Sequence, residues 1–202
     1  MARDIQDTSR EAFVRVATAQ FADKGFYGVS IAAIAAELGL TKQALLHHFG
    51  SKERLYGEVL QGISDRMTQA LVDGQEDDMA PEQRLEVFFT QLCEMALQDN
   101  TDLRLIEREL LDNRKRADDA GRWYLKPFLQ ELTAMVRDTA AWRGATEGEA
   151  FIAAYQVLGA ISYFSISEST LRGIYGEEHL GRLQERFPEH IRKIMYNLLQ
   201  TR

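Results

Sequence analysis

The apolar residues of the chain recur at helical spacing almost from end to end. Ile31, Ile34 and Leu38, for example, repeat at the i, i+3 and i+7 positions that line one face of a helix. No segment shows the sustained alternation of polar and apolar residues that marks a half-buried strand. The pattern therefore predicts an all-α protein without internal repeats.

Capping and helix-ending residues divide the beginning of the chain into short helices. Thr8 and Glu11 form a capping box for a first helix, and Gly25 ends that helix because glycine tolerates a positive φ. Ser30 is the expected N-cap of a second helix. A third helix is expected from Lys42 to His48.

Residues 30–52 predict a helix-turn-helix motif. Two short helices flank the turn at residues 39–41, where a glycine allows the chain to reverse. Small residues at positions 35 and 36 let the second helix of the motif come close across this turn. The residues expected to close the small core are Leu40, Leu45 and Phe49.

The outward face of the last motif helix is polar or small, and such a surface suits the major groove of DNA, where a recognition helix meets base edges. Its residues are Lys42, Gln43, Ala44, His47 and His48. Ser30 can bind a backbone phosphate at a helix N-terminus, and Lys52 can do so by its charge. Without further support, Lys42 and Lys52 are most simply read as solvated surface charges.

A polar run at residues 73–78 interrupts the helical pattern and is the expected domain boundary. We therefore predict an N-terminal helix-turn-helix domain at 1–52, a connecting helix at 53–72 and a helical body at 80–202. Within this body, residues 150–166 are apolar almost all round, yet too short and too polar for a membrane span. Such a helix is expected to face its own core on one side and a partner subunit on the other.

A helical bundle of this size commonly leaves an apolar pocket with a few polar groups inside it. The candidate lining residues are Phe89, Cys93, Leu105, Trp123, Phe128, Tyr155 and Tyr163. The polar groups could come from Arg108, Asn113, Gln156 and Glu168. For each of these residues taken singly, packing in the core is the more frequent role, and no pattern identifies a ligand.

Composition narrows the class of protein. The 202 residues are 45% hydrophobic, which excludes a disordered chain, and their net charge is −7, so no basic footprint covers the whole chain. The first 56 residues are nearly neutral and the rest are acidic. The single cysteine and an N-terminus without an apolar run predict a cytoplasmic protein.

Signatures of enzymes and metal sites are missing. Neither a nucleophile elbow, nor a P-loop, nor a zinc-protease motif occurs. Cys93 lies on an apolar helical face and is interpreted as a buried thiol. His47 and His48 would point about 100° apart on a helix, which argues against a metal pair. We therefore expect no catalytic residues, no metal and no cofactor.

The segment from about Thr8 to Leu60 resembles the DNA-binding domain of the TetR/AcrR family of bacterial transcriptional regulators. The likeness is carried by the loop FYGVS, by IAAIAAELGL and, at fixed spacing, by LHHFGSKERL. The resemblance implies a homeodomain-like domain in which Lys42, Gln43 and Ala44 read bases. It also implies that Ser30, His48 and Lys52 hold phosphates. Leu46 departs from the family, which usually has a phosphate-binding Tyr there, and the neighbouring His47 is the alternative donor.

Beyond this segment, the chain is similar to the family in length and in its all-helical body. The resemblance implies a C-terminal bundle for ligand binding and dimerisation, paired through helices at about 148–175 and 178–200. The expected function is a repressor that binds a palindromic double-stranded DNA operator as a homodimer and is released by a small-molecule effector. Activation stays open, and the rival class is a helical small-molecule-binding or interaction protein without DNA activity.

Overall fold

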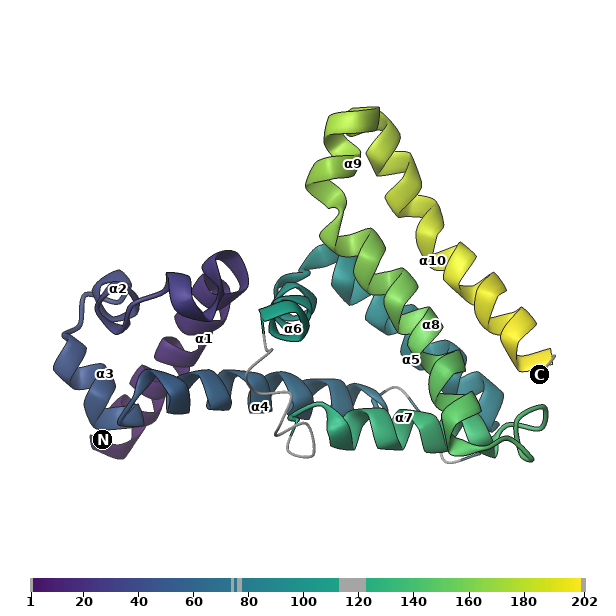
Figure 1. Cartoon of the computed structure of the whole chain (residues 1–202), viewed down its shortest axis with the longest axis horizontal. Coiled ribbons are helices and arrows are strands. Elements are labelled where there is room, and N and C mark those ends of the chain that lie inside the picture. The colour runs from purple at the N-terminus through teal and green to yellow at the C-terminus, as the bar shows by residue number, and fades with distance from the viewer. Residues whose placement is uncertain (1, 74, 76–77, 113–122, 201–202) are drawn as a thin grey trace. The chain divides into compact units, whose positions relative to one another are not determined.

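The structure is a computed structural model that describes residues 2–73, 75, 78–112 and 123–200. Over these ranges it contains ten helices and no strand, which confirms the all-α prediction (Figure 1). The helices are α1 (Ala2–Gly28), α2 (Ile31–Glu37), α3 (Lys42–Phe49), α4 (Lys52–Ala70), α5 (Pro81–Gln98), α6 (Thr101–Asp112), α7 (Lys126–Asp138), α8 (Glu147–Ile166), α9 (Glu168–Tyr175) and α10 (Glu177–Gln200).

The chain folds into two compact units, each of which is discontinuous in sequence. The first unit comprises the described residues of 1–63 and 101–124, and the second those of 64–100 and 125–202. These units differ from the predicted boundaries at 1–52, 53–72 and 80–202. The reason is that α6 packs against α1 and so belongs to the N-terminal unit.

The first unit has the core that the helical spacing predicts. Its buried side chains are Phe13, Ala17 and Phe21 of α1, Ile34 of α2, Leu45 and Phe49 of α3, and Leu55, Tyr56 and Val59 of α4. The prediction was wrong for Leu40, whose side chain is 40% exposed. Leu40 lies between Gly39, which has a φ of 66°, and the N-cap Thr41. The turn itself therefore lies at the surface, and the two helices close the core without it.

The α1 helix starts earlier than predicted and is interrupted at Gly25. The helix begins at Ala2, so the capping box predicted at Thr8 does not mark a helix start. Gly25 has a φ of 70° and a ψ of 170°, which confirms the predicted break. Helical residues resume after this break and end at Gly28. The break brings the chain into the loop that leads to Ser30.

Side chains of α6 tie that helix to α1 and α4. Arg108 donates to the backbone oxygens of Ala22 and Asp23 at 2.8 and 2.7 Å, and these carbonyls lie just before the break in α1. The buried Tyr56 hydroxyl of α4 donates to Oε2 of the buried Glu109 at 2.6 Å. Buried polar groups need such partners, so α6 is an integral part of the first unit. Arg108, predicted as a polar group of the ligand pocket, thus has hydrogen-bond partners in the backbone of α1.

The second unit is a bundle in which α8 packs against α5, α7 and α10 (Figure 1). Thr146 and Glu149 form a reciprocal capping box at the start of α8. The α8 helix ends at Ile166, and α9 follows directly. The Trp142 indole donates to the Leu198 carbonyl at 2.8 Å and ties the chain before α8 to the end of α10.

The α8 helix also passes a length and hydropathy criterion for crossing a membrane, the one helix to do so in the part of the chain that the structure describes. Core helices of soluble proteins meet the same criterion, and 39% of this stretch is buried within the bundle. The stretch 150–166, expected to be too short and too polar for a membrane span, is thus part of a 20-residue helix that meets this criterion.

Candidate nucleic-acid interface

The α3 helix presents one face to solvent because its other face is anchored in the core. Leu45 and Phe49, four residues apart, are buried against the neighbouring helices. Gln43 and His47 are exposed on the opposite side, and Lys42 is exposed at the first position of the helix. Ala44 is half-buried and Leu46 likewise, so only small or flexible side chains border the exposed residues. This face can approach a groove without any change in packing.

The N-termini of α2, α3 and α4 each carry a hydroxyl cap. The side-chain oxygens of Ser30, Thr41 and Ser51 accept hydrogen bonds from backbone amides three residues later, at 3.0, 3.2 and 3.2 Å. A hydroxyl that accepts such a bond keeps its own proton to donate, for instance to a phosphate oxygen. Thr41 was not among the predicted site residues, although a threonine directly before a helix is the signal for it. Tyr27, also outside the predicted set, is 75% exposed beside the loop to Ser30.

The two adjacent histidines of α3 have different surroundings. His47 is exposed, whereas His48 is half-buried and its ring centroid lies 5.7 Å from that of Phe13. Because His48 is only half-buried, its ring can still contact a molecule bound to the surface of α3. Across the described ranges, no three His, Cys, Asp or Glu side chains gather as a metal ion would need.

Lys52 lies at the first position of α4 and is half-buried. Its Nζ lies 4.4 Å from the centroid of the Phe26 ring. Partial burial lowers the pKa of Lys52 from its ordinary value, and the charge of Glu53 opposes that shift. Lys52, the predicted phosphate-binding residue, thus has its ammonium group over an aromatic ring.

The predicted ligand-pocket residues are divided between the two units. Leu105 is buried and Trp123 half-buried in the first unit. In the second unit, Phe89, Cys93 and Phe128 are buried, whereas Tyr155 and Tyr163 are 41% and 75% exposed on α8. Burial raises the pKa of the Cys93 thiol to about 11, so this group stays protonated at neutral pH. Burial alone does not distinguish a ligand pocket from a packed core, so the pocket stays a prediction.

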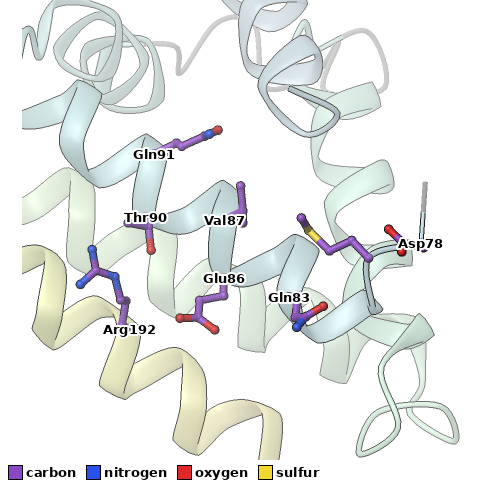
Figure 2. A pocket seen from close by; sticks show the side chains of 8 residues that line it. Asp78, Gln83, Glu86, Val87, Thr90, Gln91 and Arg192 are labelled. Carbon is purple, nitrogen blue, oxygen red and sulfur yellow. The ribbon is translucent and has the colours of Figure 1, made fainter. Parts of the chain in front are cut away.

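The second unit has an open hollow of about 680 Å³ along α5. Its lining residues are Asp78, Met79, Gln83, Glu86, Val87, Thr90, Gln91 and Arg192. Figure 2 shows Arg192 of α10 on the same side of α5 as Glu86 and Thr90. None of the seven predicted pocket residues lines this hollow. Of the predicted polar groups, Glu168 accepts from Arg172 at 2.5 Å, and Asn113 lies outside the described residues.

Comparison with known proteins identifies a family model that matches part of the first unit. Residues 13–59 match the model of the bacterial regulatory proteins, tetR family. The chain is 30% identical over 83 residues to the HTH-type transcriptional repressor KstR2 of Mycobacterium tuberculosis, covering 41% of this chain and 42% of that protein. It is 29% identical over 96 residues to the HTH-type transcriptional regulator LmrA of Bacillus subtilis, covering 46% and 51%. The chain thus spans about half the length, or less, of these curated relatives.

Solved structures resemble the fold over nearly the whole chain. A putative fatty acid metabolism regulator of Clostridium perfringens aligns with a TM-score of 0.71 and 18% identity, over 94% of this chain and 97% of its own. A transcriptional regulator of Rhodococcus sp. Rha1 aligns with a TM-score of 0.68 and 18% identity, over 95% and 96%. At 18% sequence identity, these alignments show that the fold is shared.

Proposed function

Since the chain belongs, through residues 13–59, to the tetR family of bacterial regulatory proteins, we propose that it is a ligand-responsive transcriptional repressor. It binds a palindromic operator as a homodimer in the cytoplasm and releases it when a small molecule occupies the second unit. The observation that carries the proposal is α3, with Leu45 and Phe49 buried and Lys42, Gln43 and His47 exposed.

The DNA contacts divide into two kinds. Lys42, Gln43 and Ala44 lie in the first turn of α3 and read base edges in the major groove. Phosphate contacts come from residues at helix starts and at the rim of α3, which position the motif without reading sequence. These residues are Ser30, His47, His48 and Lys52, and Leu46 contributes no hydrogen bond.

The homodimer forms through α8 and α10. Exposed apolar side chains lie on both helices; they are Ile152, Tyr155 and Tyr163 of α8 and Ile194 and Tyr196 of α10. Exposed apolar residues that share one helix face, as Ile152 and Tyr163 do on α8, are typical of protein interfaces. A two-fold axis here presents two α3 helices to successive major grooves, about 34 Å apart or a multiple of that.

The effector acts by binding one arrangement of the protein better than the other, because only a difference in affinity shifts such an equilibrium. The α4 helix begins at Lys52 in the first unit and ends at Ala70 in the second, so it connects the two. Candidate effector contacts are the buried side chains of Phe89, Cys93 and Phe128.

Selection from a random duplex library tests the proposal directly. At about 0.1 M salt, a two-fold symmetric binder enriches palindromes whose half-site centres lie about 10 base pairs, or a multiple, apart. Each recovered sequence is then checked by a gel shift at stated salt. A library without enrichment would instead favour the rival class, a helical binding protein without DNA activity.

Lys52→Ala is expected to weaken binding to all DNA sequences alike, because a phosphate contact carries no sequence information. Because the homodimer loses one such contact in each protomer, the slope of log affinity against log salt falls in magnitude by about 1.8. Fluorescence anisotropy with a labelled duplex at several KCl concentrations measures both quantities. Lys126→Ala, at an exposed lysine of α7, serves as the matched control. An unchanged slope in Lys52→Ala would remove Lys52 from the interface.

A further inference from the structure

The Phe26 ring contacts a cation in the first unit. Phe26 directly follows Gly25 in α1, and the Nζ of Lys52 lies 4.4 Å from its ring centroid. An ammonium over an aromatic face is attracted by the negative charge density of the π system. The contact is therefore attractive, in addition to any packing of the lysine stem.

The Phe26 ring is itself held in place by other aromatic side chains. Tyr56 meets it edge-on at 5.0 Å between centroids, Tyr27 does so at 5.3 Å, and Phe21 stacks at 6.1 Å. Tyr56 is in turn fixed by its hydrogen bond to Glu109. The ring therefore presents one defined orientation to Lys52.

A lysine at the start of a helix needs such support. The N-terminus of a helix carries partial positive charge, which favours acidic side chains and disfavours an ammonium. A free lysine side chain also samples many rotamers, and ordering them opposes binding. Lys52 occupies the first position of α4, so both costs apply to it unless another group holds the ammonium.

We propose that Phe26 is a positioning residue for DNA binding, whose ring holds the Lys52 ammonium at the start of α4 in readiness for a backbone phosphate. The inference rests on the proposed function and adds to it a residue that touches no DNA. An ordered ammonium meets the phosphate with less loss of freedom, and the phosphate then neutralises the charge at this helix N-terminus.

A double-mutant cycle on a labelled random-sequence duplex of about 30 base pairs tests the proposal, because phosphate contacts need no operator. Phe26→Leu is expected to weaken binding about threefold to tenfold with an unchanged salt slope, since the charge stays. In the Lys52→Ala background, the same substitution is expected to add nothing. Equal losses in both backgrounds would mean that Phe26 only stabilises the unit, and would overturn the proposal.

Fluorination separates the charge of the ring from its shape and covers the case in which Phe26→Leu fails to fold. Trifluorophenylalanine at position 26 keeps the ring and depletes its face of negative charge, so we expect the same loss, again only when Lys52 is present. Phe26→Trp keeps an aromatic face over the ammonium, so this variant is expected to bind the duplex as tightly as the unmodified protein. The control places the fluorinated residue at Phe88, which is buried in the second unit.

Two results would count against the proposal in different ways. If the fluorinated protein binds as tightly as the unmodified one, Phe26 does not act through Lys52, and the proposed function is untouched. If the unmodified protein binds no duplex at 50 mM KCl, the proposed function fails and this inference fails with it.

Discussion

Replacing Ile152 and Tyr163 of α8 by glutamate is expected to yield a monomer that binds its operator between a hundredfold and ten-thousandfold more weakly. The two side chains are 58% and 75% exposed and lie eleven residues apart, on the same face of the helix. Two buried carboxylates facing their symmetry mates would oppose association. A monomer reads one half-site and loses the effective concentration that linkage provides, about two to four orders of magnitude.

Sedimentation equilibrium gives the oligomeric state, and a gel shift on the selected palindrome gives the affinity. Met95→Glu is the matched control, since Met95 is an apolar residue of the same unit, 55% exposed, on α5. Its dimer and its affinity should stay unchanged. A double variant on α8 that still sediments as a dimer would place the interface elsewhere.

Combining Lys42→Ala with Gln43→Ala is expected to abolish most of the preference for the selected operator while leaving binding to random DNA largely intact. A good base contact contributes about 1–3 kcal/mol of discrimination, and contacts at separate positions are roughly additive. Since the homodimer loses both contacts in each of two half-sites, the preference should fall by at least about three orders of magnitude. Both side chains are exposed on the first turn of α3, so their loss leaves the core unchanged.

Competition between labelled operator and unlabelled random duplex measures this preference. Gln98→Ala, an exposed glutamine of α5 in the second unit, should behave like the unaltered protein. A combined variant that keeps the full preference would show that α3 is not the recognition helix, and the account of base reading would need another element.

Local signals made the helix-turn-helix motif predictable. Ser30 caps α2 and Gly39 has a positive φ, as their residue types indicate. The apolar spacing likewise identified Leu45 and Phe49 as the buried face of α3. Helix caps, turns and helical periodicity depend on residues close together in the sequence, so they can be predicted from the sequence alone.

Long-range contacts were not predictable in this way. Arg108 reaches the carbonyl of Ala22 over 86 positions, and nothing in the pattern of α6 identifies that partner. Leu105 was for this reason assigned to a pocket of the helical body, although it is buried in the first unit. The outward direction of Tyr163 was equally hidden, because α8 is apolar on almost every side.

The attachment of α6 to the N-terminal unit has a consequence for dissecting or recombining this protein. Cutting the chain after residue 63 removes Glu109 from Tyr56 and Arg108 from the end of α1, and exposes the surface that α6 covers. The DNA-reading part is therefore not a detachable N-terminal module. A chimera that grafts it onto another effector body must carry residues 101–112 along with it.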